Sequence, residues 1–472
     1  MKSVLAIDIG ATSGRAILAS IEGEKLNFKE VNRFSNTPIK KKGYLCWNVE
    51  ELFSKILESI QIACNQTELI SVGIDTWGVD FALVNKLGKL ISLPVCYRDC
   101  RTHGILEGIS SIASLSELYS KTGNQLMEIN TLFQLLSTKM EIPNIYYRAD
   151  KLLMMPDYFN FLLTGKQVIE RSIASTTQMV NPITRDWNRE VLSLFDISDL
   201  LLPCIVEEGS ILGSVKSEFG FGDVKVINVC EHDTASALVA IPNQEEKCLF
   251  VSSGTWSLIG TEIAAPIINQ KSLKYNFTNE SGNNGTTTFL KNCTGLWIVE
   301  ELRREYELNH QFYTFNDITT MVMACQSDVA IVDTDSSEFA EPGQMIEKIC
   351  HYASKTGQKV PITAGEIFKS AYLSLAHKYK EVIEQLEDLT DYKYQTLNLI
   401  GGGSKSKYFS QLVADITGKV VITGLTEATA IGNILIQMIA VGEIKNLTLA
   451  KEFVKKSIET IYYKPNQKET LL

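Results

Sequence analysis

The chain has 472 residues, of which 45% are hydrophobic and 21% are charged, and its formal net charge is −10. This length predicts two large domains, because a single hydrophobic core rarely serves more than about 300 residues. The negative charge argues against a nucleic-acid-binding surface. No apolar run reaches the ~18 residues of a membrane span, and Asp8 interrupts the first apolar run, so neither a membrane anchor nor a signal peptide is expected. The ten cysteines are scattered without zinc-ligand spacing and are expected to be reduced, as in a cytoplasmic protein.

Residues 3–19 predict a β-hairpin around a polar turn. Two short apolar segments, residues 3–7 and 16–19, flank the segment 8–15. This segment contains two glycines, two hydroxyl side chains and an arginine: Gly10, Gly14, Thr12, Ser13 and Arg15. Turns of this composition need no ligand, but glycine backbone, hydroxyl donors and a guanidinium group also suit a phosphate. Asp8 ends a buried strand, where a carboxylate is costly unless it is paired or faces a cation. The hairpin therefore predicts either a plain turn or a phosphate and magnesium site.

Three other segments of the first half are predicted to be structural. A helix is capped by Asn48 and runs to about Cys64. The polar cluster 97–102 follows a short strand and suggests a solvated, salt-bridged loop. Residues 152–163 suggest a strongly apolar helix that ends at Gly165.

Another predicted strand, residues 69–75, ends in a polar segment that could form the wall of a small pocket. This segment contains two acids, Asp75 and Asp80, together with a tryptophan and a glycine. The alternative is a twisted hairpin formed with residues 82–84, in which the Asp75 side chain caps backbone groups close to it in the sequence. From this segment alone, the hairpin is the favoured interpretation.

The middle of the chain places an acid beside a histidine. His232 and Asp233 precede an apolar run, residues 237–241. Asp233 could be a general base that takes a proton from a nearby hydroxyl group. Alternatively, Asp233 caps the helix that follows, since aspartate is a favoured N-cap residue.

The second half contains two glycine-bearing turns that follow predicted strands. Residues 251–259 repeat the strand, hydroxyl-rich turn and strand of the N-terminus. Residues 396–400 form another predicted strand, followed by the glycine triplet 401–403, a helix and a strand at residues 420–422. Backbone exposed by glycine can lie against a base or a phosphate, and open α/β sheets bind ligands at the carboxyl ends of their strands.

Three further helices are predicted in this half. The first opens at residues 291–295, after a strand at 286–290, and runs to about Tyr306. Its charged residues suggest a solvated face with i,i+3 and i,i+4 pairs. The other two helices cover residues 364–387 and 427–438.

In this order, the segments resemble the FGGY family of carbohydrate kinases, which share the α/β fold of two ribonuclease-H-like domains found in actin, hexokinase and Hsp70. Seven motifs carry the resemblance: Asp8-Ile-Gly-Ala-Thr-Ser-Gly-Arg15, Gly73-Ile-Asp-Thr-Trp-Gly-Val-Asp-Phe81, Tyr97-Arg-Asp-Cys-Arg-Thr102, Met155-Pro-Asp-Tyr-Phe159, His232-Asp-Thr-Ala-Ser-Ala237, Ser252-Ser-Gly-Thr-Trp-Ser257 and Gly401-Gly-Gly403. They are collinear over nearly the whole chain. The motifs at 73–81 and 232–237 are specific, whereas the glycine turns alone are not. Within the family, the match is closest to rhamnulokinases, with L-fuculose kinases as near relatives.

The resemblance implies an enzyme that uses ATP and Mg²⁺ to phosphorylate the C1 hydroxyl of a 6-deoxy-L-ketohexose, L-rhamnulose or alternatively L-fuculose. Asp233 would be the catalytic base, and Asp8 would belong to the magnesium shell. The sugar would contact five residues: Gly78, His232, Asp233, Thr234 and Asn292. Eight residues would bind the nucleotide, the first five at its β- and γ-phosphates, Thr255 at a further phosphate and Gly402 on the adenine side: Ala11, Thr12, Ser13, Gly14, Arg15, Thr255, Glu300 and Gly402.

The resemblance also implies an N-terminal domain, residues 1–241, and a C-terminal nucleotide-binding domain, residues 242–472, which close over an active-site cleft. The partners would be a sugar and ATP, without nucleic acid or membrane, and the sequence does not distinguish a monomer from a dimer. It departs from the family at Glu300, where a glutamine is expected, so that nucleotide contact stays open. It also lacks a closely spaced cysteine pair, because Val413 and Thr417 stand there.

Two other classes of protein remain alternatives. An ATP-binding switch on the same fold would need the nucleotide turns but no acid that faces a sugar, so the motif around His232 and Asp233 counts against it. A hydrolase could pair Asp233 with Asp75 or Asp80. Such an enzyme would leave two phosphate turns and a glycine triplet unexplained.

Overall fold

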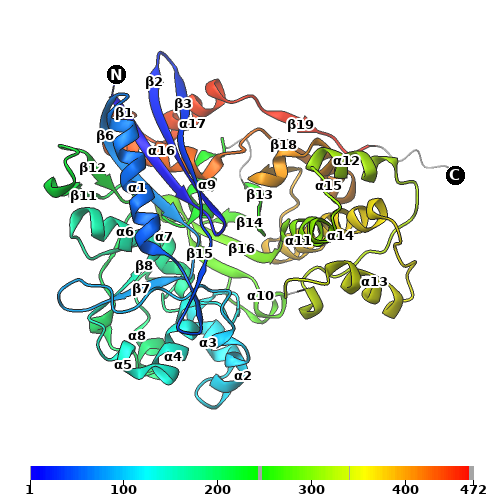
Figure 1. Ribbon diagram of the computed structural model, residues 1–472, viewed down its shortest axis with the longest axis horizontal. Coiled ribbons are helices and arrows are strands. Elements are labelled where there is room, and N and C mark those ends of the chain that lie inside the picture. The colour runs from blue at the N-terminus through cyan, green and yellow to red at the C-terminus, as the bar shows by residue number, and fades with distance from the viewer. Residues whose placement is uncertain (1, 243–246, 340, 467–472) are drawn as a thin grey trace. The chain divides into compact units, whose positions relative to one another are not determined.

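The computed structural model describes residues 2–242, 247–339 and 341–466 (Figure 1). The chain forms two compact units. Unit 1 comprises Met1–Asn243, Glu262–Phe289 and Glu427–Glu459, and unit 2 comprises Gln244–Thr261, Leu290–Thr426 and Thr460–Leu472. The first segment of unit 1 ends at residue 243, close to the boundary expected at residue 241, but two later segments return to this unit. Neither unit is therefore one continuous stretch of chain.

Unit 1 is built on a six-stranded sheet. Its strands lie in the order β11 (Ile211–Ser214), β12 (Lys225–Ile227), β6 (Glu68–Thr76), β1 (Lys2–Ile9), β2 (Ser13–Glu22) and β3 (Lys25–Ser35). The antiparallel pairing of β1 with β2 confirms the predicted hairpin. The apolar strands β1 and β6 run parallel in the buried centre of the sheet, with Asp8 opposite Asp75. Two acids therefore lie side by side at the carboxyl ends of neighbouring parallel strands, where open α/β sheets bind ligands.

The helices of unit 1 begin with α1, whose N-cap is Asn48 as predicted; its side chain accepts a hydrogen bond from Glu51 N. They are α1 (Val49–Cys64), α2 (Ile105–Gly108), α3 (Leu115–Thr122), α4 (Thr131–Glu141), α5 (Pro143–Tyr146), α6 (Met155–Thr164), α7 (Arg171–Ala174), α8 (Arg189–Leu194), α9 (Asp233–Ala240), α10 (Gln270–Tyr275), α16 (Ala428–Ala440) and α17 (Leu447–Ser457). Helix α16 packs against β1, β6 and α9. A Cβ atom on Gly432 would lie 1.8 Å from the Ser236 carbonyl oxygen, so α9 and α16 approach this closely only because residue 432 is glycine.

Two predictions that follow β6 are wrong. β7 (Phe81–Val84) pairs with β8 (Lys151–Met154) and not with β6, so the expected hairpin does not form. Residues 152–154 consequently belong to a strand, and α6 begins only near Pro156, which favours the first turn of a helix. Gly165 ends α6 as predicted. The remaining short strands of unit 1 are β4 (Ile39–Lys41), β5 (Tyr44–Cys46), β9 (Ile169–Glu170), β10 (Ile205–Val206) and β15 (Thr278–Ser281).

The polar cluster 97–102 is not a solvated loop. Asp99 is only 8% exposed, and its carboxylate accepts hydrogen bonds from the backbone of Leu45 and of Arg101. The Arg101 guanidinium in turn donates to Gln134 Oε1 at 2.8 Å. The strand expected before this cluster is reduced to an isolated bridge. Buried hydrogen bonds, and not surface ion pairs, therefore hold this segment.

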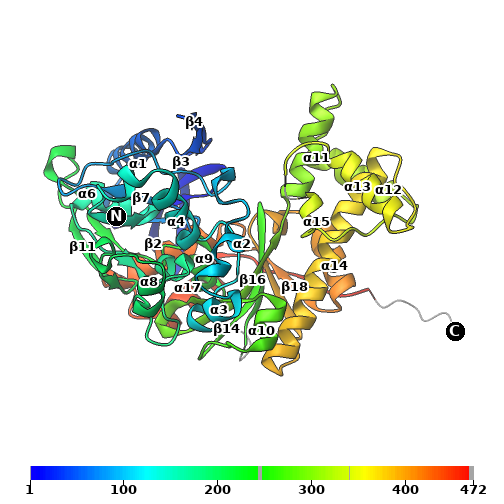
Figure 2. The same ribbon diagram turned by 90° about the horizontal axis from the view of Figure 1, so that it is seen from below.

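A second sheet contains β14 (Trp256–Ile263), β13 (Leu249–Ser253), β17 (Thr396–Ile400), β18 (Val420–Thr423) and β19 (Ile461–Tyr463) side by side in this order. The helices of unit 2 are α11 (Trp297–Leu308), α12 (Phe315–Ala324), α13 (Met345–Lys355), α14 (Ala364–Thr390) and α15 (Lys407–Thr417) (Figure 2). A capping box of Thr363 and Glu366 starts α14, close to its predicted beginning. The strand, glycine turn, helix and strand predicted from residue 396 onward are confirmed. The helix expected to open at residues 291–295 starts later, because β16 (Thr287–Thr294) continues through most of that segment.

Among the residues that the structure describes, no helix combines the length and the apolar character that a membrane crossing requires.

Candidate active site

Asp233 lies in the first turn of α9 and does not cap it. The N-cap is His232, whose side chain makes no capping hydrogen bond. The backbone before α9 is held from two directions. Thr76 N donates to the Glu231 carbonyl oxygen at 2.9 Å, and His232 N donates to Ser172 Oγ at 3.1 Å. The capping alternative is therefore wrong, and contacts with β6 and α7 fix the start of this helix.

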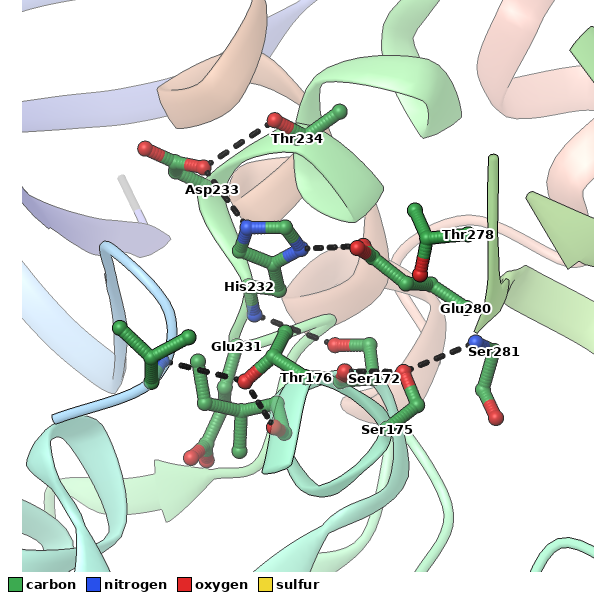
Figure 3. Close-up of polar contacts among 12 residues, drawn as sticks. Ser172, Ser175, Thr176, Glu231, His232, Asp233, Thr234, Thr278, Glu280 and Ser281 are labelled. Atoms are coloured by element: carbon green, nitrogen blue, oxygen red, sulfur yellow. Dashed lines mark hydrogen bonds and ion pairs between the residues drawn. The ribbon is translucent and has the colours of Figure 1, made fainter. Parts of the chain in front are cut away.

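The imidazole ring of His232 lies between two carboxylates, as Figure 3 shows. Its Nε2 atom lies 3.4 Å from Asp233 Oδ1, and its Nδ1 atom lies 3.1 Å from Glu280 Oε2. Burial by itself lowers the pKa of His232, but the charges of Glu280 and Asp233 outweigh burial and raise this pKa to about 9. The ring is therefore a cation at neutral pH.

Three acids gather where β1 and β6 end and α9 begins: Asp8, Asp75 and Asp233. The side chain of Asp233 is 34% exposed, whereas that of Asp8 is 6% exposed and Asp75 is fully buried. Desolvation raises the pKa of Asp233 above its ordinary value, and the His232 cation opposes this rise. Thr234 is buried and donates its hydroxyl to Asp233 Oδ1 at 3.2 Å. Of these three acids, Asp233 is thus the one that a substrate can reach.

Asp8 and Arg15 form an ion pair across the paired strands β1 and β2. Arg15 donates twice to Asp8 Oδ2, at 2.8 and 2.6 Å, and also pairs with Glu427. Burial lowers the pKa of Arg15, but the charges of these two carboxylates outweigh burial and raise the pKa above its ordinary value, so the guanidinium keeps its charge. Beside this pair, one carboxylate oxygen of Asp75 accepts from Asn433 at 2.6 Å, and the other has no hydrogen-bond partner among the described residues. A phosphate at this hairpin would share Arg15 with acids.

Residues 11–13, at the end of the turn and the first position of β2, present hydroxyl groups to solvent, because Thr12 and Ser13 are exposed. Gly14 has a different role from the one expected. A Cβ atom there would lie 2.3 Å from the ring of Phe34, so close packing requires this glycine whether or not an anion binds. The donors that the turn offers to a phosphate are therefore its exposed hydroxyl and backbone N–H groups.

The pocket segment after β6 carries backbone strain. Val79 has a φ of 67°, in the left-handed region that a β-branched residue rarely adopts. Three hydrogen bonds hold it there: its N–H donates to Thr176 Oγ1 at 3.1 Å, and its carbonyl oxygen accepts from Thr131 Oγ1 at 2.7 Å and from Gln134 Nε2 at 3.3 Å. Gly78 lies against the same threonine, since a Cβ atom there would be 3.1 Å from Thr176 Cγ2. Strain of this kind concentrates at functional sites, which favours the pocket over a plain turn.

Asp80 is a structural residue of this segment. It is fully buried, and its carboxylate accepts from Trp47 Nε1 at 2.6 Å, Trp77 Nε1 at 3.0 Å and Gln134 Nε2 at 2.8 Å. Because neutral donors occupy both of its oxygens, Asp80 holds the loop in place. It does not form the carboxylate pair with Asp233 that the hydrolase alternative needs.

Three more carboxyl groups are buried beneath the start of α9, on Asp157, Glu170 and Glu231. Glu170 accepts hydrogen bonds from Glu231 N at 3.0 Å and from Ser172 Oγ at 2.5 Å. Burial raises the pKa of Glu170 to about 7, and it raises the pKa of Asp157 and of Glu231 well above their ordinary values. Burial therefore disfavours the charged form of all three carboxyl groups, and Glu170 anchors the backbone that leads into His232.

In unit 2, two turns lie side by side because β13 and β17 run parallel. Gly401 has a φ of 79°, and a Cβ atom on it would lie 2.9 Å from the Ser253 carbonyl oxygen. A Cβ atom on Gly403 would lie 2.3 Å from Ser253 Oγ. Gly402 is exposed, and the nearest atom to its hypothetical Cβ is 3.8 Å away. The outer glycines are thus required by packing, and the middle one leaves its backbone open to a ligand.

Thr255 lies in the other turn, between β13 and β14. Gly254 N donates to the Trp256 carbonyl oxygen at 2.9 Å and closes the turn. The first residues of α11 attach to it, since Leu296 N donates to Gly254 O at 2.8 Å and Trp297 N to Thr255 O at 3.3 Å. A helix N-terminus and a hydroxyl-bearing turn therefore meet, an arrangement that suits a phosphate.

Glu300 lies in the first turn of α11, with 47% of its side chain exposed, and pairs with Arg303 at 3.0 Å. The neighbouring pair of Glu301 and Arg304, at 2.7 Å, is also of the predicted i,i+3 type, but Glu301 is only 8% exposed. The helix face is thus solvated only in part.

Asn292 lies on β16.

The residues predicted to form the site divide between the units. Asp8, residues 11–15, Gly78 and residues 232–234 belong to unit 1, and Thr255, Asn292, Glu300 and Gly402 belong to unit 2.

The donor set fits Mg²⁺ and ATP. Mg²⁺ usually takes one or two carboxylates and completes its shell with water and substrate phosphates. Asp8 supplies a carboxylate at the phosphate hairpin, and the unpartnered oxygen of Asp75 adds negative charge beside it. Within the described ranges, no cluster of three or more His, Cys, Asp or Glu side chains could hold a metal by itself. An ion here would depend on the nucleotide for most of its ligands.

Two residues of this site were not predicted, Glu280 and Thr176. Glu280 lies on β15, whose sequence Thr-Asn-Glu-Ser is polar throughout although every residue is buried. Such a strand has no apolar alternation and gives no sequence signal. Thr176 follows Ser175 in a run of hydroxyl residues, which is a weak signal for a polar site.

Residues 3–240 match the N-terminal domain of the FGGY family of carbohydrate kinases, and residues 249–441 match its C-terminal domain. Curated relatives include the rhamnulokinase of Oceanobacillus iheyensis, which is 41% identical over 464 residues and is matched over 97% of each chain. The rhamnulokinase of Halalkalibacterium halodurans is 39% identical over 469 residues, with 98% of this chain and 99% of that protein covered.

Solved structures with the same fold include a gluconate kinase from Lactobacillus acidophilus, with a TM-score of 0.80, 18% identity, and 99% of this chain and 94% of that chain covered. A glycerol kinase from Plasmodium falciparum, solved with ADP, has a TM-score of 0.80 at 17% identity, and the match covers 99% of this chain and 95% of the kinase chain. These likenesses confirm the predicted actin- and hexokinase-like fold. The chain belongs to the FGGY family of carbohydrate kinases.

Proposed function

We propose that this chain transfers the γ-phosphoryl group of ATP to the C1 hydroxyl of L-rhamnulose. The observation that carries the proposal is its similarity to seven curated relatives, all named rhamnulokinase, at 36–41% identity over nearly their whole length. These relatives favour L-rhamnulose over L-fuculose. Membership in a family of carbohydrate kinases also removes the alternatives of a non-enzymatic switch and of a hydrolase.

In this mechanism Asp233 accepts the proton of the C1 hydroxyl as that oxygen attacks phosphorus. The residue is suited to this role by its exposure and by its raised pKa, since a general base works best when its pKa approaches the working pH. The His232 cation, 3.4 Å away, stabilises the carboxylate form of Asp233 before the proton arrives. Gly78, His232, Thr234 and Asn292 orient the sugar, Thr234 indirectly through its hydrogen bond to Asp233.

The phosphate groups would be held by the exposed turn at residues 11–13 with Gly14 and Arg15, and by Thr255 in unit 2. Gly402 would lie against the adenine side, with Glu300 near the nucleotide. Mg²⁺, when bound at Asp8, supplies positive charge that offsets the charge of the transferring phosphoryl group. Arg15 adds a fixed cation to the same end of the hairpin.

A cytoplasmic location is part of the proposal. None of the ten cysteines, each of which lies in a described range, forms a disulfide bond in the structure, as is usual for a cytoplasmic protein. ATP is the second small-molecule partner.

A panel of acceptors tests the proposed function by following ADP release. We expect turnover of L-rhamnulose, weaker turnover of its epimer L-fuculose, and a product whose phosphorus couples to the C1 protons in NMR spectra. 1-Deoxy-L-rhamnulose should bind as a competitive inhibitor but release no ADP. Preferred turnover of glycerol, D-xylulose or gluconate would contradict the proposal, as would ADP release that does not depend on any sugar.

A further inference from the structure

Glu280 is a buried acid that the mechanism above does not use. It is 7% exposed, and the strand that carries it, β15, is tied down on both sides of it. Ser281 N donates to Ser175 Oγ at 2.9 Å, and the Asn279 side chain donates to the Gly123 carbonyl oxygen at 3.0 Å. The anchored strand thus holds the carboxylate of Glu280 in a fixed position.

The contact that Glu280 makes there determines the orientation of a ring in the active site. Its Oε2 atom lies 3.1 Å from His232 Nδ1, so the opposite ring nitrogen, Nε2, points toward Asp233 (Figure 3). The backbone of His232 is already fixed by Ser172. With the backbone and Nδ1 both held, the ring has one orientation, and Nε2 carries a proton that faces the proposed base.

The charges around these groups explain why the orientation matters. His232 is faced by Glu280 on β15, by Asp233 on α9 and by Glu170 on β9. Asp233 is faced by His232 and by the acid Asp8 on β1, and it also acts on the buried acid Asp75 of β6. Without a cation at His232, the carboxylate of Asp233 would keep its hydrogen bond from Thr234 but would face the charge of Asp8 without a neighbouring cation, and it would hold a proton at higher pH.

We propose that Glu280 is a positioning residue of the phosphoryl transfer: it holds the ring of His232 so that Nε2 faces Asp233 and keeps the base in its carboxylate form. This inference rests on the proposed role of Asp233 as proton acceptor. Glu280 acts through His232 and touches neither the sugar nor the nucleotide in this scheme.

Glu280→Gln tests the inference, with Glu24→Gln as the matched control because Glu24 is 81% exposed and pairs with Lys456 at the surface. Loss of a partner that orients a metal-bound histidine typically costs about 10- to 100-fold in activity, and we expect kcat with the preferred sugar to fall by a similar factor at pH 7. The KM for ATP should stay within twofold. Glu24→Gln should match the wild type.

The pH profile separates positioning from a merely structural role. In Glu280→Gln the His232 cation loses its stronger carboxylate partner, so burial lowers its pKa from about 9 and Asp233 takes up a proton at higher pH. We therefore expect the acidic limb of kcat/KM to move upward and the deficit to shrink between pH 6 and pH 9. Glu280→Asp keeps the charge and should restore the wild-type limb, with an intermediate kcat.

Each outcome decides the question. An unchanged acidic limb in Glu280→Gln, or a loss of activity equal at every pH, would overturn the inference even if the melting temperature falls. The inference would also be overturned if the acidic limb shifted as far in Glu280→Asp as in Glu280→Gln. If the wild type prefers a sugar other than L-rhamnulose, the proposed substrate is wrong, and the same comparison made on the preferred sugar still tests Glu280.

Discussion

Replacing Asp233 with asparagine removes the proposed proton acceptor and changes the size of the side chain very little. The amide oxygen of the new side chain can still accept the hydrogen bond that Thr234 Oγ1 donates at 3.2 Å. His232 loses one charged neighbour but keeps Glu280 at 3.1 Å, so the ring stays in place. The sugar is therefore expected to bind with a KM close to that of the wild type, while the proton of its hydroxyl has no acceptor.

The expected loss follows from the size of general-base catalysis, which contributes ~10²–10⁴-fold. At 1.36 kcal/mol for each factor of ten, this corresponds to about 3–5 kcal/mol of activation free energy. The stability cost should be small, because Asp233 is 34% exposed and does not cap α9. Coupled ADP release at saturating MgATP, with L-rhamnulose varied, measures kcat and KM, and thermal unfolding measures stability.

Asp223→Asn is the matched control for this substitution. Asp223 is a surface residue of unit 1 that pairs with Lys225 at 2.6 Å with 75% of its side chain exposed, so its loss should leave kcat unchanged. If the Asp233→Asn enzyme kept a kcat within a few-fold of wild type, Asp233 would not be the base. A large rise in the sugar KM with kcat unchanged would instead assign Asp233 to binding alone.

Three further substitutions test other parts of the site. Glu300→Gln removes an exposed surface pair, so stability should change by less than about 0.5 kcal/mol and the KM for ATP should fall or stay constant; a rise in the sugar KM alone would place the residue elsewhere. Gly403→Ala puts a Cβ atom 2.3 Å from Ser253 Oγ, so both the melting temperature and the affinity for ADP should drop, whereas Gly108→Ala, with no atom within 4 Å, should do neither. Glu231 has a pKa raised well above its ordinary value, so it binds a proton on folding, and the folded state loses stability as pH rises above the pKa that Glu231 has in the unfolded chain. Glu231→Gln should therefore lose less thermal stability than the wild type between pH 5 and pH 8, and an identical pH dependence of the two proteins would contradict this assignment.

The sequence determined those elements whose signals are local. The apolar runs around the hairpin of β1 and β2, the Asn48 cap of α1 and the glycine triplet after β17 were all predictable, because each depends on neighbours within a few residues. The collinear motifs also identified the family, and they named His232 and Asp233 as the chemical centre. A wrong prediction arose where local propensity competed with a distant partner: residues 152–154 are apolar enough for a helix, but pairing with β7 makes them a strand.

Only the tertiary structure decided which polar groups meet. Glu280 comes from a strand without apolar residues, and its contact with His232 exists because that strand is folded into unit 1. The hydrogen bond from Asn433 to Asp75 joins residues 358 positions apart, on α16 and β6. Local sequence pattern cannot predict such pairs, because a buried polar group needs a hydrogen-bond partner and only the tertiary fold decides which group lies near it. The chain order thus predicted Asp233 as the base, and the folded chain placed His232 and Glu280 beside it.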